Sequence, residues 1–304
     1  GGPFFCASLP TNRRTQANRE SAMTAHIQPT SAALGAFVTG LDLTRPLSDG
    51  DAHALHAAAT AHKVVFLPDQ DLTLDDLERV TDDLGGRTVT PFVTPLPDRP
   101  MVVKVLKEAD AKISFGEAWH TDLSYLPEPP AFTCLWSHEI PPRGGDTMWS
   151  NQAAAYAALD DETKAELAGL YAFHGAGRPY GAKGYYSTVT NQISMGIEPS
   201  AEADKEFRHP VVAKHPVTGE PILFVNQTYT IRIDGYDKDR SDRLLKRLFL
   251  HAVEERFRYR VQWRPHMLTI WDNRSTQHFA INDYHGHRRE MFRTSVKGTP
   301  LRAA

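Results

Sequence analysis

Short stretches of apolar residues, alternating with polar residues or running together, recur along the whole chain and predict a protein built mainly of β-strands. Each stretch is rich in β-branched or aromatic residues and is bounded by Pro, Gly or Asp, which is typical of strands. The segment 215–221 (HPVTGEP) has the composition of a hairpin turn. Strands are expected within residues 35–43, 64–68, 101–107, 131–140, 221–233, 259–263, 266–273 and 291–298.

Helical spacing is found in four segments only: 48–63, 73–84, 151–171 and 241–258. The first of them starts beside a suitable N-cap, Ser48 or Asp49. Because strands and helices do not alternate regularly, a parallel βαβ sheet is not favoured. Many antiparallel strands with helices on one side favour a barrel or jelly roll. We therefore predict one mainly β (α+β) domain with flanking helices over residues 26–304.

Two segments fall outside this pattern. Residues 1–25 are polar, unpatterned and without an apolar signal core, so we expect a disordered tail. Met23 is a candidate natural start, with vector or upstream-frame residues before it. Residues 173–206 are rich in Gly, Tyr, Ser and Asn and show little periodicity, which is typical of a lid or a disordered insertion. We predict a lid over the substrate there.

The composition argues against several classes of function. The net charge is −3 and there is no long Lys/Arg run, so nucleic acid is not an expected partner. No stretch reaches the roughly 18 apolar residues of a membrane span. The two cysteines, Cys6 and Cys134, exclude a disulfide framework or a Cys-rich zinc site and fit a reducing compartment. We expect a cytoplasmic protein.

A candidate metal-binding pair lies in the sequence WHTD, residues 119–122. On an extended segment, side chains two residues apart point to the same side, so His120 and Asp122 can hold one ion. An imidazole and a carboxylate suit Fe(II) when a second His completes one face. Three protein ligands would leave three open positions for a chelating cosubstrate and O2. Alone this signal is weak, because about one His-x-Asp is expected by chance in a chain of this composition.

Two further motifs strengthen the assignment. Residues 271–278 read WDNRSTQH, and Arg289 follows His278 by eleven residues; residues 144–147 read GGDT. Together with the His-x-Asp pair, these ordered motifs resemble the TauD/TfdA (taurine dioxygenase) family of Fe(II)/2-oxoglutarate-dependent dioxygenases. The resemblance extends from about residue 27 to about residue 299 without large gaps.

The resemblance implies a double-stranded β-helix (a cupin-like jelly roll) and hydroxylation of a substrate with release of succinate and CO2. It implies that His120, Asp122 and His278 bind Fe(II), and that 2-oxoglutarate and O2 are cosubstrates. Arg289 would hold the distal carboxylate of 2-oxoglutarate as a bidentate, charge-assisted pair, and Thr147 would add a hydrogen bond. Family members are commonly homo-oligomers, so a homo-oligomer is expected.

Arg293 shares a strand face with Arg289 and Met291. If that face lines a barrel interior, two guanidinium groups are buried, and a buried charge is costly unless it is paired. The cosubstrate carboxylate satisfies only one of them, so we infer that a substrate anion binds near Arg293. Two alternatives stay open: Arg293 pairs with a protein carboxylate, or it also serves 2-oxoglutarate.

The predicted substrate pocket departs from that of the taurine-using enzymes. Thr90, Val93 and Gly116 stand where those enzymes have a His, a Tyr and an Asn, and the aromatic position after the FVN segment is Tyr229. Loss of these polar contacts removes recognition of a small aminosulfonate. We expect a bulkier small anion: a sulfonate, a sulfate ester, or an aryloxy or alkyl acid.

Two readings from other classes compete with the dioxygenase. A zinc hydrolase can use the same two His and one Asp, but it leaves Arg289 and the GGDT segment without a role. A non-catalytic jelly-roll binding protein is the other alternative, although all three ligands and the Arg are intact.

Overall fold

The computed structural model of the protein describes residues 25–304. The expected disordered tail therefore lies outside the described residues, apart from Ala25. Most of the described chain is organised by one large sheet, with the strand order β1-β2-β3-β14-β6-β16-β4, and with β5 also paired to β16. All of its pairings are antiparallel except β2 with β3, as the prediction of an antiparallel architecture requires. Its strands are β1 (His26–Pro29), β2 (Ala36–Thr39), β3 (Val64–Leu67), β4 (Arg87–Thr88), β5 (Val103–Lys107), β6 (Phe132–Glu139), β14 (Leu268–Asp272) and β16 (Arg289–Val296).

A smaller antiparallel sheet is formed by β13 (Arg258–Val261), β7 (Thr147–Asn151) and β15 (Thr276–Ala280). Aromatic side chains connect it to the large sheet. The ring of Trp149 on β7 lies 5.7 Å from the ring of Phe66 on β3 and 5.7 Å from the ring of Trp271 on β14. The space between the two sheets is thus filled by buried side chains, and this core surrounds the site described below.

Two more three-stranded sheets complete the strands. One has the order β12 (Thr230–Ile233), β8 (Tyr171–Gly175) and β9 (Glu206–Pro210). The other has the order β11 (Pro221–Leu223), β10 (Val212–Lys214) and β17 (Arg302–Ala303). In β10 and β11, Lys214 pairs with Pro221, which confirms the hairpin turn predicted between them.

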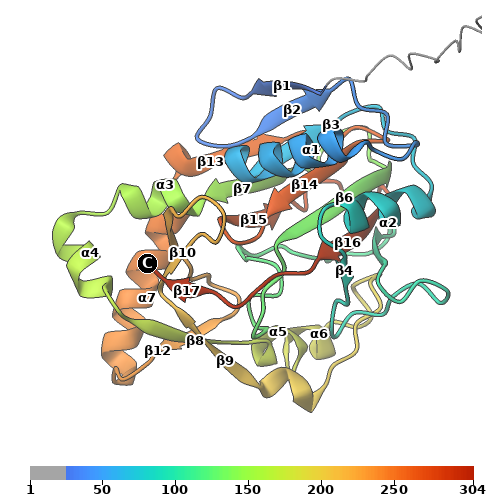
Figure 1. The fold of residues 1–304 in the computed structure, drawn as a ribbon. Coiled ribbons are helices and arrows are strands. Elements are labelled where there is room, and N and C mark those ends of the chain that lie inside the picture. The colour runs from blue at the N-terminus through green and yellow to red at the C-terminus, as the bar shows by residue number, and fades with distance from the viewer. Residues whose placement is uncertain (1–24) are drawn as a thin grey trace, which may run out of the picture.

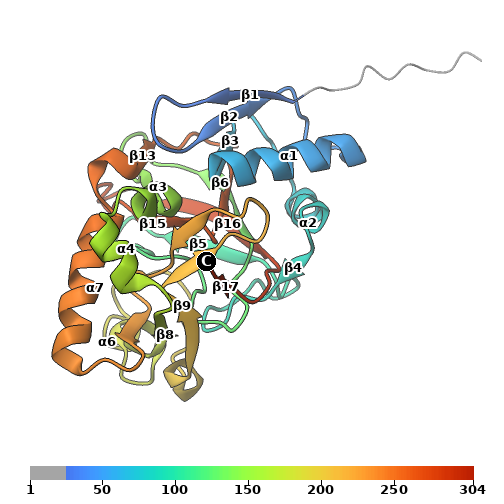
Figure 2. The ribbon, with the colours of Figure 1, turned by 60° about the vertical axis from the view of Figure 1, so that its left-hand side comes forward.

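Helices cover the outside of these sheets (Figures 1 and 2). α1 (Asp49–His62) packs on β3 and β14, and α2 (Leu74–Asp83) packs on β16, so both cover the outer side of the large sheet. α1 begins at the predicted cap, where the Ser48 hydroxyl accepts a hydrogen bond from the Asp51 N–H, and α2 begins at a capping box formed by Thr73 and Asp76. On the side of the smaller sheets lie α3 (Gln152–Ala157), α4 (Asp161–Leu167), α7 (Lys238–Ala252) and the short η2 (Glu255–Phe257).

Three predicted elements are divided or displaced. The run 221–233 is two strands, because residues 224–229 leave the sheet and the Asn226 side chain bonds Ser124 and Tyr229 instead. The predicted helix 151–171 is α3 and α4, since Asp160 caps a new helix. The helix expected from Ser241 begins three residues earlier, where Asp237 caps it, and ends at Ala252.

Residues 173–206 are ordered, so the alternative of a disordered insertion is wrong. They hold the end of β8, the beginning of β9 and three short helices between them: α5 (Gly177–Tyr180), α6 (Tyr185–Thr188) and η1 (Ala201–Asp204). α5 and α6 lie together at one end of the molecule (Figure 1). Within residues 25–304, no helix is long and apolar enough to cross a membrane.

Candidate metal and cosubstrate site

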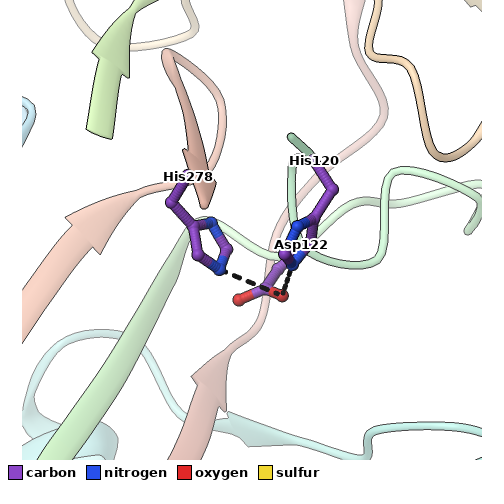
Figure 3. Close-up of side chains that lie close together, drawn as sticks. All are labelled: His120, Asp122 and His278. Carbon is purple, nitrogen blue, oxygen red and sulfur yellow. Dashed lines mark ion pairs between the residues drawn. The ribbon is translucent and has the colours of Figure 1, made fainter. Parts of the chain in front are cut away.

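His120, Asp122 and His278 meet inside the core (Figure 3). The Oδ1 atom of Asp122 lies 3.5 Å from Nε2 of His120 and 4.0 Å from Nε2 of His278. One ligand atom from each residue lies within 4.8 Å of the others, and all three residues are buried. The structure therefore brings the predicted ligands into one cluster that can hold a metal ion.

Backbone pairing brings the two histidines together. The N–H of His120 donates to the carbonyl of His278 (3.1 Å), and the N–H of His278 donates to the carbonyl of His120 (2.8 Å). His278 sits in the middle of β15, opposite Trp149 of β7. The chain around His120 thus joins the edge of the smaller sheet, and Asp122, two residues on, turns its carboxylate toward both imidazoles.

The histidines present lone pairs rather than protons to the cluster. Nδ1 of His120 lies 2.7 Å from the carbonyl of Ala118. A carbonyl accepts only a proton, so this bond places the proton on Nδ1 and leaves the Nε2 lone pair for a metal. Burial, together with the nearby His120, lowers the pKa of His278 to about 3, so its imidazole is neutral at physiological pH.

Asp122 is oriented by a two-step hydrogen-bond chain. The hydroxyl of Thr133 donates to Oδ2 of Asp122 at 2.9 Å, and the side-chain amide of Asn273 donates to that hydroxyl at 2.8 Å. Oδ1 is thereby left facing the histidines. Burial raises the pKa of this carboxyl, but Arg293, His278 and His120 outweigh burial and hold the pKa well below its usual range. Asp122 is therefore an ionised ligand.

The donor set suits Fe(II). Two imidazoles and one carboxylate on one face of an ion leave open positions for exchangeable ligands. Nothing described contributes a fourth ligand to the cluster among residues 25–304. Zinc accepts the same donors, so the cluster alone does not separate the dioxygenase from the hydrolase.

Arg289 favours the dioxygenase over the zinc hydrolase. Its side chain is buried, its Nε has no hydrogen-bond partner, and no carboxylate of the described chain forms an ion pair with it. Arg289 and Thr147 line the same narrow cavity as His120 and His278. The Thr147 hydroxyl accepts a bond from the Trp263 indole N–H at 2.9 Å, so its own proton is free for another acceptor. The cavity wall therefore presents unpaired donors to an anion beside the His-Asp-His cluster.

Arg293 lines this cavity as well, but it is partly engaged. Its Nη1 lies 3.3 Å from Oδ1 of Asp122, while its Nε, also buried, has no partner. Of the alternatives left open by the sequence, pairing with a protein carboxylate is thus present in the structure. The N–H groups of this guanidinium that do not contact Asp122 can donate to a second anion.

A wider cavity of about 420 Å³ opens on the other side of His120. It shares Phe115, Gly116 and His120 with the narrow cavity, and aromatic residues make much of its wall. We call it the aromatic chamber; its rings are Phe115, Tyr180, Tyr185, Tyr186 and Tyr229. Gly116 and Tyr229, predicted to contact substrate, do line it. The sequence motifs did not single out Phe115 or the three tyrosines of α5 and α6, although their density in residues 173–206 was a usable signal.

Thr90 and Val93 are placed differently. Val93 is buried in the core, where it forms an isolated bridge with Ile197, and neither residue lines the chamber or the narrow cavity. Their predicted role in substrate binding has no support from the geometry.

The remaining polar residues of the WDNR segment brace the turn that leads to His278, as expected. Buried Asp272 accepts hydrogen bonds from Arg274 and from Nε2 of His215 (3.0 Å). The backbone N–H groups of Val217 and Thr218 occupy the other ring nitrogen of His215. This cluster is internally satisfied and holds β14 and the following turn in place.

Comparison with known proteins gives concordant matches. The family described as "Taurine catabolism dioxygenase TauD, TfdA family" matches residues 24–295. An α-ketoglutarate-dependent sulfate ester dioxygenase of Pseudomonas putida is 29% identical over 286 residues, covering 91% of each chain. An (S)-phenoxypropionate/α-ketoglutarate-dioxygenase of Delftia acidovorans is 29% identical over 289 residues, covering 91% of this chain and 96% of its own. The crystal structure of a taurine dioxygenase from Burkholderia xenovorans superposes with a TM-score of 0.77 at 30% identity, covering 92% of this chain and 93% of its own.

Proposed function

This chain belongs to the taurine catabolism dioxygenase TauD, TfdA family, and on that premise we propose the roles of its site residues and the nature of its substrate. The protein is a 2-oxoglutarate-dependent dioxygenase that uses Fe(II) and O2. One observation carries the assignment of residues: the two histidines of the His-Asp-His cluster line one cavity with a buried arginine that has no counter-ion among residues 25–304. Neither a zinc hydrolase nor a non-catalytic binding protein needs that arrangement.

His120, Asp122 and His278 hold Fe(II). The Ala118 carbonyl keeps His120 in the ligating tautomer, and the Thr133 hydroxyl keeps one oxygen of Asp122 turned toward the ion. When bound, Fe(II) with 2-oxoglutarate and O2 supplies the oxidising power, so that the cosubstrate becomes succinate and CO2 and the substrate gains a hydroxyl group.

Arg289 and Thr147 bind the distal carboxylate of 2-oxoglutarate. The guanidinium offers two parallel donors, which suit a carboxylate, and the free proton of the Thr147 hydroxyl adds a third. Trp263 supports both residues, since its indole N–H bonds Thr147 and its ring lies 5.6 Å from the Arg289 guanidinium carbon. This anchor orients the cosubstrate with its keto acid end toward the three metal ligands.

We assign the substrate to the aromatic chamber, with its anionic group near Arg293. Arg293 and the chamber meet at Phe115, whose ring lies 5.7 Å from the guanidinium carbon. The one carboxylate among the lining residues, Glu117, already accepts hydrogen bonds from the Ser114 N–H and the Asn282 amide. Both donors are neutral and leave the charge of Glu117 in place, but the five rings give an aryl or alkyl body more contact than the short aminoethyl group of taurine.

A sulfate ester, a sulfonate or an aryloxy acid with a neutral apolar body is therefore the proposed substrate. Relatives that act on a sulfate ester and on phenoxypropionate support this range of anions. Tyr180 and Tyr186 bring α5 and α6 over the chamber, which supports the role of residues 173–206 as a lid. The two facing sheets, β3 and β14 on one side and β7 and β15 on the other, support a double-stranded β-helix. A single domain, a homo-oligomer and a cytoplasmic location remain predictions.

Succinate release tests the proposal. The protein loaded with Fe(II) is given 2-oxoglutarate, O2 and one acid at a time: taurine, a medium-chain alkyl sulfonate, an alkyl sulfate or a phenoxy acid. We expect coupled succinate release with one of the bulky acids, and its loss in Arg293→Met. Coupling to taurine alone would overturn the substrate assignment. Sulfate release from the alkyl sulfate without O2 or 2-oxoglutarate would instead establish the zinc hydrolase.

A further inference from the structure

Lys107, the last residue of β5, is a buried cation without a described function. Lys107 is 2% exposed, and its Nζ has no hydrogen-bond partner among residues 25–304. It lies over the ring of Tyr284, whose centroid is 4.5 Å from Nζ. One cation–π contact offsets only part of the cost of removing an ammonium group from water. Glu117 and Asp110 act on this charge from a distance, but no carboxylate among residues 25–304 forms an ion pair with Nζ.

The strand pairing places this lysine beside the cosubstrate anchor. β5 and β16 are antiparallel, and Lys107 is directly opposite Arg289. Directly opposed residues project to the same face of a sheet, with Cβ atoms about 5 Å apart. The alternating burial of β5 shows that this face is the inner one, and Val105, two residues before Lys107, lines the narrow cavity.

Tyr284 and the Gly144–Gly145 turn complete the enclosure. A Cβ on Gly145 would lie 3.2 Å from Cδ1 of Tyr284 and 3.4 Å from Cδ of Arg289, so both side chains pack against the same backbone. The Tyr284 hydroxyl is 3.0 Å from the Ser114 hydroxyl. Lys107 and Tyr284 are thus neighbours of Arg289, which lines the narrow cavity where the distal carboxylate is proposed to bind.

Three acidic residues of this region have partners other than Lys107 and Arg289. Asp146 pairs with Arg260 (2.6 Å), Glu108 pairs with Arg288 (3.2 Å), and Glu117 accepts from Asn282 (2.8 Å). Lys107 and Arg289 are thus two adjacent buried cations, and neither forms an ion pair with a carboxylate of the described chain. Like charges so placed repel each other unless an anion joins them.

We propose that Lys107 is a second cation of the cosubstrate site, and that it acts together with Arg289 on the distal carboxylate of 2-oxoglutarate. This inference rests on the proposed function, which places that carboxylate at Arg289. Arg289 supplies direct, directional donors, whereas Lys107 supplies positive charge from behind, in a region from which water is excluded. Its charge raises affinity for a dicarboxylate and contributes nothing to a keto acid that lacks the second carboxylate.

Affinities for two keto acids at equilibrium distinguish a role of Lys107 in cosubstrate binding from a purely structural role. Protein loaded with Mn(II) is titrated calorimetrically, without O2, with 2-oxoglutarate and with 2-oxopentanoate, which has a methyl group in place of the distal carboxylate. In Lys107→Met we expect roughly tenfold weaker binding of 2-oxoglutarate and unchanged binding of 2-oxopentanoate. The matched control is Lys104→Met, on the same strand but on its other face, where Nζ lies 3.4 Å from Glu290; it should change neither affinity.

Three outcomes overturn the proposal: unchanged binding of 2-oxoglutarate in Lys107→Met, an equal loss for both ligands, or the same loss in the Lys104 control. Arg289→Met tests the premise separately. If it leaves 2-oxoglutarate binding intact, the proposed cosubstrate site itself is wrong; if it weakens binding while Lys107→Met does not, only the role of Lys107 fails. Lys107→Gln, neutral and able to hydrogen-bond, carries the same expectation should the methionine variant not fold.

Discussion

His120 and His278 exchange both backbone hydrogen bonds, at 3.1 and 2.8 Å, although they lie in distant parts of the chain. This pairing sets the two imidazole rings 4.1 Å apart, centroid to centroid, with both Nε2 atoms toward Asp122. The metal ligands are thus presented by paired backbone rather than by independent loops. A site held in this way keeps its geometry before the metal arrives.

Removal of either histidine should abolish metal binding without unfolding the protein. In His278→Ala only two ligands remain, so the affinity for Mn(II) or Co(II), measured by calorimetric titration, should fall at least a hundredfold. His287→Ala is the control, because His287 is exposed in the loop before β16. Retained tight binding in His278→Ala would show that the ion binds elsewhere.

The Thr133 hydroxyl should contribute to metal affinity through Asp122. Thr133→Val keeps the shape but removes the donor to Oδ2, so Asp122 loses its fixed orientation. We expect about tenfold weaker Mn(II) binding, the usual lower range for an outer-shell partner. Thr269→Val is a matched control: Thr269 is buried on β14 and its hydroxyl has no hydrogen-bond partner. That variant should bind Mn(II) normally and be as stable as the parent or more so; equal losses in both would contradict the proposed orienting role.

Arg289→Met should separate cosubstrate affinity from fold stability. A charge-assisted carboxylate pair contributes about 1.5–3 kcal/mol, so the dissociation constant for 2-oxoglutarate should rise about 10- to 150-fold. Without cosubstrate the same change removes an unpaired buried charge, and the melting temperature should stay equal or increase. A large drop in melting temperature would indicate that Arg289 has a structural counter-ion.

Gly116 should be restricted by its backbone rather than by the metal site. It has φ +86°, whereas a Cβ there would lie 3.4 Å from Cε1 of His120, which is an ordinary van der Waals contact. Gly116→Ala should therefore cost about 1 kcal/mol of stability from the backbone and leave metal binding unchanged. Gly286→Ala should cost the same, because φ is +79° and nothing lies within 4 Å. Chemical denaturation and Mn(II) titration of both variants check this; a loss of Mn(II) affinity in Gly116→Ala alone would contradict it.

Stability should fall in mild acid because of buried histidines away from the metal. Burial lowers the pKa of His209 to about 4 and lowers that of its neighbour His174 as well. The unfolded chain binds these protons near pH 6.5 and the folded chain does not, so the free energy of unfolding decreases as pH falls from about 6.5 toward 4. For His209 the difference corresponds to on the order of 3 kcal/mol.

His209→Gln checks this assignment. The glutamine amide can still donate to the Leu126 carbonyl, which His209 bonds at 2.9 Å through Nε2. Urea denaturation from pH 7 to pH 4.5 should show a flatter pH dependence in the variant than in the parent. Identical slopes would place the responsible protons on other groups.

Several structural features could be predicted from short segments of the sequence. The two-residue repeat of a strand put His120 beside Asp122 and put Arg289, Met291 and Arg293 on one face, and all of them are buried there. The cap at Ser48 marked the start of α1 correctly, and helical spacing over 73–84 located α2. Strands β7 and β15, which carry Thr147 and His278, were missed, because each is short and largely polar; partners on both sides, not an apolar pattern, keep them extended.

The sequence by itself determined the ligand types, their order and the local faces from which they project, because strand periodicity and motif spacing act within a few residues. Only the tertiary structure decided that Arg293 pairs with Asp122, that Asn273 reaches Asp122 through Thr133, and that Lys107 stands opposite Arg289. It also decided that the tyrosines of α5 and α6, not Thr90 and Val93, line the chamber next to His120. Such neighbours come from strands and loops far apart in the chain, whose register is set by packing of the whole core. Patterns within a few residues of sequence therefore cannot predict these contacts.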